Sequence, residues 1–429
     1  MSLFNTLNTG ITGLGSNGLS MSVIGDNISN LNTVGYKGSQ AEFQDLILQQ
    51  LGGGRGQLGQ GSFTGRVAQV FGQGSLENSA NGTDLAIDGK GFFVVADADG
   101  NQFFSRAGQF RQDSDGYLTN VAGARLQGYP ALADGSLSTA IGDLQIGGTP
   151  IPGTATTEVM LDANLSATAV AGPLPVPTAP ATELTNAEVA AAAEFTTSTV
   201  VYDSLGAAHD VTLAYYKTDV NEWSFSAYVD AGETGGTPGD LVEISTGTLN
   251  FNTDATLDTA TSTVTSTAVT FDGAAAQTIN FDFGMAATDE GNLTQDASAS
   301  SVVEIDPDGN GAGSLASFDI ANDGTITGVY TNGETRELGE VVLATFQSEQ
   351  NLSRVGHNMY AATRESGAAA IGSADGGGRG VIHGYALEMS NVDIEKQFVK
   401  MIQSQKGYQA SARVVSGADE LLQELMQIV

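Results

Sequence analysis

The sequence of 429 residues contains no cysteine, a single tryptophan and few cationic side chains. The absence of cysteine excludes disulfides, thiolate metal sites and cysteine nucleophiles together. Basic residues are scarce, with 16 lysines and arginines against 49 aspartates and glutamates, which gives a net charge of −33. Twenty-eight of these acids, but only one base, Lys217, lie between Leu126 and Thr335. Because such a surface repels a phosphate backbone, no nucleic-acid partner is expected.

Long apolar runs are also missing. Every apolar run is far shorter than the about 18 residues needed to cross a bilayer, so no membrane insertion is expected. No Lys or Arg precedes Lys37, and the first residues form no continuous apolar segment. A cleaved secretory signal peptide is therefore not expected, and any export would use another route than general secretion.

Patterns typical of catalysis or metal binding are scarce. None of the three histidines has a second His or a Glu four residues away, and neither a phosphate-binding loop nor a Gly-x-Ser-x-Gly elbow is present. The run Asp306–Gly311 begins like a calcium loop, but its twelfth position is Ser317 where a glutamate is needed. We interpret it as a polar turn in preference to a weak calcium site. The sequence therefore predicts no enzyme, no catalytic residue, no cofactor and no metal.

What the sequence does contain is a matching apolar pattern at its two ends. Apolar residues recur there at alternating three- and four-residue steps, and we expect them to form an assembly seam: Leu7, Leu14, Met21 and Ile28 near the N-terminus, and Ile394, Phe398, Met401, Tyr408 and Leu422 near the C-terminus. A repeat of 3.5 residues keeps one side of a helix against another helix, as in a coiled coil. The alternative is a pair of amphipathic helices that cap an ordinary core. Five glycines between Gly10 and Gly25 weaken the first helix, so it is expected to fold only against a partner.

Between the two helices the sequence predicts short strands and tight turns. Val211, Leu213 and Tyr215 alternate with polar or small residues, and Asn332-Gly333 is a strong hairpin turn. Ser390, with Asp393 three residues later, resembles a capping box that opens the last helix. The order predicts a multidomain, mainly β fold with paired α-helical termini and a second β domain inserted into the first. The expected parts are a helical domain at 1–36 and 385–429, extended connectors at 37–75 and 376–384, an inner β domain at 76–154 and 299–375, and an inserted outer β domain at 155–298.

Several segments then resemble a known family. The run NISNLNTVGYK, from Asn27 to Lys37, resembles the N-terminal signature of the bacterial flagellar rod, hook and hook-associated proteins, and LEMSNVD, from Leu387 to Asp393, resembles their C-terminal signature. Residues 85–93 and 104–110 are similar to segments that rod and hook subunits share. The residues that carry the two terminal signatures are Asn27, Asn30, Gly35, Tyr36, Asn391, Asp393 and Gln409.

Residues 200–210, Glu222-Trp223 and 338–346 resemble the inserted domain and returning strand of the hook members of this family. This resemblance implies a structural subunit that polymerises into a curved hollow tube, a universal joint that passes torque from rod to filament. It implies as partners further copies of the chain, the distal rod protein, the hook cap, the hook–filament junction proteins and the flagellar type III export apparatus. It also implies a location in the basal body and hook, outside the cell after export.

Two other functions remain as alternatives. A distal rod subunit of the same family would share both signatures, but rod members lack a large middle insertion. A secreted β-rich adhesin or binding module would account for the acidic, Thr/Ser/Gly-rich middle, but it has no need of paired terminal heptads. A hydrolase is disfavoured because the sequence has no nucleophile elbow and no metal cluster.

Overall fold

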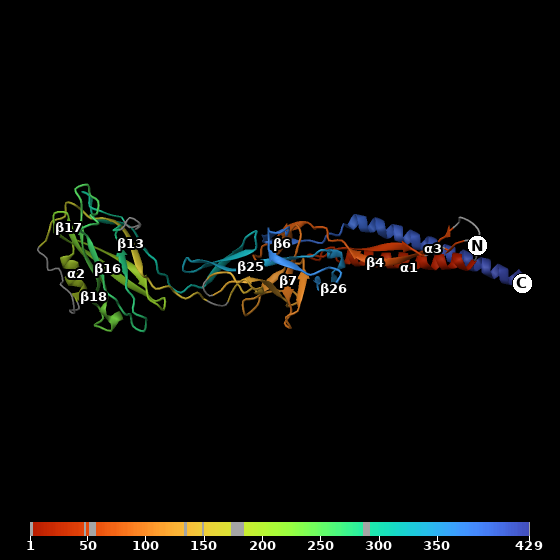
Figure 1. Cartoon of the computed structure of the whole chain (residues 1–429), viewed down its shortest axis with the longest axis horizontal. Helices are drawn as coiled ribbons and strands as arrows, with labels where there is room; N and C mark the ends of the chain where they lie inside the picture. Colours follow the sequence, from red (N-terminus) through yellow and green to blue (C-terminus); the bar gives the residue numbers. More distant parts are fainter. Residues whose placement is uncertain are drawn as a thin grey trace. The chain divides into compact units, whose positions relative to one another are not determined.

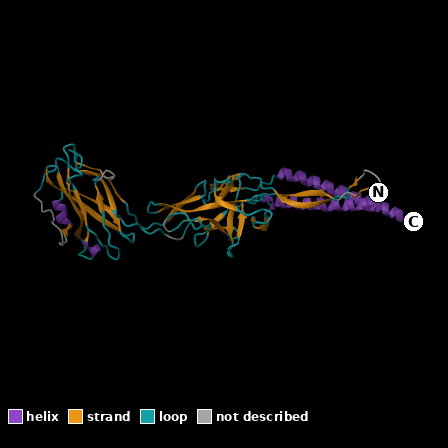
Figure 2. Cartoon of the chain, viewed as in Figure 1, coloured by secondary structure: helices purple, strands orange, loops and turns teal. Residues whose placement is uncertain are grey.

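The computed structural model describes residues 3–46, 49–50, 57–132, 135–147, 150–172, 184–285 and 292–428. They form two compact units. Unit 1 contains Met1–Gly148, Ala316–Val329 and Thr335–Val429, and unit 2 contains Thr149–Leu315 and Tyr330–Glu334. Both units consist mostly of strands, and the two long helices lie at the ends of the chain (Figure 2). The predicted fold class is therefore confirmed.

The terminal helices α1 (Leu3–Ser29) and α3 (Ile394–Ile428) pack side by side (Figure 1). Helix α3 begins at Ile394 because the Asp393 carboxylate accepts hydrogen bonds from the backbone N–H groups of Glu395 at 3.0 Å and Lys396 at 3.1 Å. The expected helix start at Ser390 is thus wrong by one turn. The Ser390 hydroxyl accepts instead from the N–H of Val392, in the turn before the helix.

The segment expected as an extended connector at 37–75 is largely a β-hairpin. Strands β1 (Ser39–Asp45) and β4 (Ser62–Gln69) pair antiparallel and pack along α1, and β2 (Gln49–Gln50) pairs with β3 (Gln57–Leu58). The expected connector at 376–384 also ends in a strand, since β29 (Val381–Gly384) pairs with β6 (Leu85–Asp88). Strand β5 (Leu76–Asn78) pairs with β30 (Ala386–Glu388). The glycine run at 52–56 lies outside the described residues.

The main sheet of unit 1 is buried on both faces. On β7, Phe93 and Val95 belong to one hydrophobic cluster, while Phe92 and Val94 belong to another on the opposite face. Double burial explains why this strand is a continuous apolar run without alternation. The strands of the sheet are β7 (Phe92–Ala96), β8 (Gln102–Ser105), β9 (Phe110–Gln112), β10 (Leu118–Asn120), β11 (Arg125–Pro130), β12 (Gly142–Asp143), β23 (Leu315–Ile320), β24 (Thr325–Tyr330), β25 (Thr335–Thr345), β26 (Ser353–Gly356), β27 (Met359–Ala361) and β28 (Ala370–Ser373). A short 3-10 helix, η2 (Glu349–Asn351), precedes β26.

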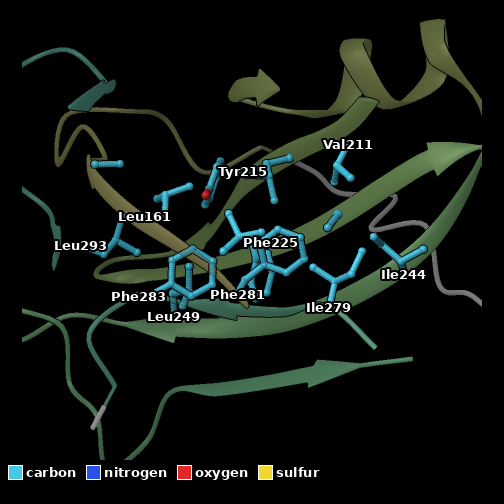
Figure 3. Close-up of a cluster of buried hydrophobic side chains, with 14 of the residues drawn as sticks. Leu161, Val211, Tyr215, Phe225, Ile244, Leu249, Ile279, Phe281, Phe283 and Leu293 are labelled. Carbon is cyan, nitrogen blue, oxygen red and sulfur yellow. The ribbon is translucent and has the colours of Figure 1, made fainter. Parts of the chain in front are cut away.

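Unit 2 has its own core between two sheets. Tyr215 and Phe225 pack there with Phe281, Phe283 and Leu161 (Figure 3). One sheet contains β14 (Leu184–Thr185), β15 (Phe195–Tyr202), β16 (Ala208–Asp219), β17 (Glu222–Asp230), β18 (Asp240–Asn250) and β19 (Thr263–Ser266); the other contains β13 (Glu158–Asn164), β20 (Asn280–Asp282), β21 (Asn292–Thr294) and β22 (Ser301–Pro307). Helix α2 (Asn186–Ala192) and the 3-10 helix η1 (Ala231–Thr234) complete the unit.

The boundary expected at residue 298 is too early, because β22 pairs with β13 and keeps the chain in unit 2 as far as Leu315. The run that begins like a calcium loop starts with the last two residues of β22, Asp306 and Pro307. There the Asp308 carboxylate accepts from the backbone N–H groups of Thr157 at 2.8 Å and Glu158 at 3.1 Å. These bonds favour the interpretation as a polar turn. Among the described residues, no helix is long and apolar enough to cross a membrane.

Candidate assembly interface

The contact between α1 and α3 is centred on small and polar residues, with Val415 packed beside them. A Cβ atom placed on Gly10 would lie 2.8 Å from Cγ2 of Val415, so the two backbones approach closely only because this position is glycine. The hydroxyls of Ser20 and Ser404 are hydrogen-bonded at 2.9 Å. On α3 the seam recurs every seven residues, through Ser404, Ser411 and Ala418. We call this contact the inner seam.

The predicted assembly seam lies beside and outside the inner seam. Its N-terminal members, with Met401 and Leu422 on α3, are half-buried: Leu7, Leu14, Met21 and Ile28. Its remaining members on α3 are more exposed, at 40% for Ile394, 48% for Phe398 and 42% for Tyr408. The helices therefore pair through small residues, and the largest apolar side chains of α3 are left with much of their surface uncovered.

Family-signature residues gather where α1, the hairpin, α3 and the β body of unit 1 meet, a region we call the junction. Gly35 has a φ of +68°, and a Cβ there would lie 2.4 Å from the backbone nitrogen of Ala107. Its N–H donates to the carbonyl oxygen of Glu388 at 2.7 Å. Only glycine fits this position without strain, which gives the signature glycine a physical reason.

Two signature asparagines bind backbone groups in the junction. The Asn27 side chain donates to the carbonyl oxygen of Ser39 at 2.7 Å and accepts from its N–H at 2.8 Å. Asn391 accepts from the N–H of Gly38 at 2.8 Å and donates to the carbonyl oxygens of Val70 at 2.7 Å and Gly72 at 2.9 Å. Each side-chain amide thereby hydrogen-bonds backbone N–H and C=O groups at the start of the hairpin that no neighbouring strand pairs with.

A buried charge cluster lies beneath these bonds. Lys37 and Glu388 are fully buried, and the Lys37 Nζ lies 2.6 Å from Glu388 Oε1. Arg106, 3% exposed, lies 3.4 Å from Oε2 of the same carboxylate and donates to the carbonyl oxygen of Gly89 at 2.8 Å. Burial lowers the pKa of Lys37 and of Arg106, and the charge of Glu388 opposes that shift in both. The Glu388 carboxylate, on β30, thus joins the segment before β1, which contains Lys37, to the loop after β8, which contains Arg106.

Two more signature residues support the end of α1. The Tyr36 hydroxyl donates to the Asp26 carboxylate at 3.0 Å, and burial raises the pKa of Tyr36. The Arg354 guanidinium lies 5.2 Å from the centre of the Tyr36 ring. The Asn30 side chain accepts from the Thr33 hydroxyl at 3.2 Å.

The seven signature residues therefore fall into three places. Five lie in the junction or at the end of α1, and Asp393 caps α3. Gln409 lies apart, exposed on α3. Sequence reasoning missed the charge cluster of Lys37, Arg106 and Glu388. A signal was present, because each of these charges lies inside a family-like segment: 27–37, 104–110 or 387–393.

Comparison with known proteins covers both ends and both units. Residues 7–37 match the "Flagella basal body rod protein" family, 86–167 the "Flagellar hook protein FlgE/F/G D1 domain", 160–310 the "Flagellar basal body protein FlaE D2 domain" and 384–428 the "Flagellar basal body rod FlgEFG protein C-terminal". The flagellar hook protein FlgE of Salmonella typhimurium is 33% identical over 427 residues, 97% of this chain and 98% of that protein. The chain belongs to the flagellar hook protein FlgE family.

Relatives from distant bacteria agree over similar lengths. FlgE of Borreliella burgdorferi is 30% identical over 99% of this chain and 100% of that protein, and FlgE of Rhizobium meliloti is 31% identical over 100% of both. A crystal structure of Helicobacter pylori FlgE2 aligns with a TM-score of 0.48 and 15% identity, over 72% of this chain and 99% of that chain. The family is one of structural proteins, and the chain is a structural subunit of the bacterial flagellar hook.

Proposed function

We propose that this subunit polymerises into a curved hollow tube through contacts between α1–α3 pairs of neighbouring copies. The observation that carries this proposal is the uncovered apolar surface of α3. Phe398 is 48% exposed, and Val399 and Ile402 are each 56% exposed, within one and a half turns of helix. A cluster of large apolar side chains on the outside of a helical pair is typical of an interface.

In this proposal unit 2 forms an outer layer whose contacts slide. Lys217, the only lysine or arginine between Leu126 and Thr335, is itself buried, while acids are spread over the unit. Facing copies of unit 2 therefore repel, which prevents large dry contacts that would lock the tube. A tube with firm inner and loose outer contacts bends while it transmits rotation, as a universal joint between rod and filament requires.

The proposal extends to partners and route. The distal rod protein and the hook–filament junction proteins would contact the two ends of the tube, and a hook cap would cover its growing end. Export through the flagellar type III apparatus, without a cleaved signal peptide, suits a chain whose α1 has weak helix propensity and no disulfide to break.

The test is a charge placed in the exposed apolar cluster. Phe398→Asp is expected to abolish polymerisation, since burying an unpaired carboxylate in every subunit contact costs several kcal/mol. The thermal transition of the monomer is expected to stay unchanged because the Phe398 side chain is half in water there. Val220→Asp, at a position 81% exposed on unit 2, is the matched control and is expected to polymerise. Normal polymerisation of Phe398→Asp would contradict the proposal.

A further inference from the structure

A second stripe runs along α3 on the side away from the inner seam. It contains Ile402, Lys406, Arg413, Ser416 and Glu420, at steps of three, four or seven residues, and all five are exposed. Because the inner seam occupies Ser404, Ser411 and Ala418, helical geometry places this outer stripe on the opposite side of α3. The spacing is that of a coiled-coil seam, but within the described part of this chain no helix covers it.

Charge is divided along the outer stripe. Lys406 and Arg413 lie in its middle and Glu420 lies at its end, with Glu424 about one turn further along α3. Among the described residues, none of these four side chains has an ion-pair or hydrogen-bond partner in the chain, although other charges of the same helix do, such as Lys396 with Asp393 at 3.1 Å. Four of the 16 basic residues of the whole chain lie on α3, between Lys396 and Arg413. A bipolar stripe of this kind complements a copy of itself that is shifted along its axis.

Side-chain size also varies along the outer stripe, over the same two-heptad distance. Ile402 projects a large apolar side chain and is 56% exposed, whereas Ser416 and Gly417 two heptads later are small. A Cβ placed on Gly417 would meet no atom within 4 Å, so the surface there is open. A parallel copy shifted by two heptads, roughly 21 Å at 1.5 Å per residue, brings Ile402 of one copy beside Ser416 of the other. The same shift brings Lys406 beside Glu420.

We propose that the outer stripe is a contact between two copies of this chain, staggered by about two heptads, and that the Lys406–Glu420 pair fixes the stagger. The proposal rests on the proposed polymerisation and adds its register. Without a stagger, Lys406 and Arg413 would face the same residues of the neighbour and repel. Opposite charges at facing positions select register in coiled coils for this reason.

A charge swap in the full-length chain tests the register. Lys406→Glu alone and Glu420→Lys alone each place like charges opposite one another, and each is expected to raise the critical concentration for polymerisation about three- to tenfold at low ionic strength. The double variant K406E/E420K restores an opposite pair and is expected to polymerise within about twofold of the unaltered protein. Added salt is expected to reduce the defect of both single variants because it screens exposed charges.

The matched control is K406E/D419K. It has the same net charge as K406E/E420K, but residue 419 lies one position away and points to another side of α3. This control is expected to stay as impaired as Lys406→Glu. Recovery in both double variants, recovery in neither, or normal polymerisation of Lys406→Glu would overturn the proposed register while the unaltered protein still polymerises. If the unaltered protein formed no polymer, the proposed function would fail together with the register.

Discussion

The buried carboxylate of Glu388 offers a sharp test of how the two ends of the chain are fastened to the β body. It lies 2.6 Å from Lys37 and 3.4 Å from Arg106, and it also accepts the backbone N–H of Gly74 at 2.8 Å. Glu388→Gln keeps the size of the side chain but removes its charge. It also replaces one carboxylate oxygen, which accepts hydrogen bonds, by an NH2 group, which donates them. Two buried cations then lack an anion.

We expect Glu388→Gln to lower the free energy of unfolding of unit 1 by about 3–5 kcal/mol, the usual effect of removing one partner of a buried ion pair. Lys37→Met in the same background removes one stranded cation. The double variant K37M/E388Q is therefore expected to be less destabilised than the sum of the two single variants, by at least about 1 kcal/mol. The measurement is guanidinium unfolding followed by near-UV circular dichroism.

Glu42→Gln provides the control. Glu42 pairs with Arg66 at 2.7 Å, but both side chains are about half exposed, and its loss is expected to leave the unfolding midpoint unchanged. If Glu388→Gln changed the midpoint no more than Glu42→Gln does, or if the Lys37 and Glu388 effects were additive, the junction would not depend on this charge cluster. Some other interaction would then have to hold the family-like segments together at the junction.

Three further predictions concern other parts of the chain. Gly35→Ala is expected to destabilise unit 1 by more than about 1 kcal/mol in urea unfolding, because its Cβ would meet the Ala107 backbone at a φ of +68°; Gly100→Ala, where a Cβ meets nothing, separates the steric effect from the effect of φ alone. Gly10→Ala is expected to reduce helix content by far-UV circular dichroism despite its better helix propensity, because its Cβ would collide with Val415, and Val415→Ala is expected to restore it. Unit 2 is expected to lose stability above pH 10, because burial raises the pKa of Tyr215, Tyr216 and Tyr228 above the unfolded value of 10.0. Above pH 10 the unfolded chain loses these phenol protons before the folded chain does, which favours unfolding; below pH 10 both states keep the protons and the stability of unit 2 is unaffected. Lys217, whose pKa burial lowers, opposes the loss only below pH 10.5, and an unfolding free energy of unit 2 that stays flat from pH 9 to about pH 11.5 would contradict this reasoning.

Patterns that depend on burial were predictable from the sequence. The alternation of Val211, Leu213 and Tyr215 predicted a strand, and all three lie in the core of unit 2. Helix pairing was predictable as well, because a 3.5-residue repeat at both ends is typical of two helices that pack along each other. The hairpin of β1 and β4 was not predicted, because Gly65 lies at an irregularity in its register and glycine-rich runs flank it. The pairing of distant segments at the junction required the three-dimensional structure.

The position of the inner seam around α3 shows most clearly why the sequence did not predict which residues pair the two helices. Apolar periodicity gives weight to Phe398 and Ile394, but close packing of two helices selects small residues such as Ser404 and Ser411. Around α3, Phe398 lies about 100° from the stripe of Ser404 and Ser411, a shift of one residue, and Ile394 lies about 60° from it. A pattern built on side-chain size therefore gives most weight to apolar side chains at the edge of the contact, and it passes over the small residues at its centre.

The inner seam and the exposed apolar side chains of α3 are expected to form their contacts at different stages. Glycines at the inner seam let α1 and α3 approach closely, but each lowers the helix propensity of α1 by about 1 kcal/mol relative to alanine. Helix α1 therefore depends on α3 and on the junction for its stability, and it offers little resistance to being unfolded. The large apolar side chains of α3 contribute little inside one chain, because about half of the Phe398 surface stays in water. In the proposed polymer these side chains are buried between copies, so we expect the free energy of their burial to be released on polymerisation and not before it.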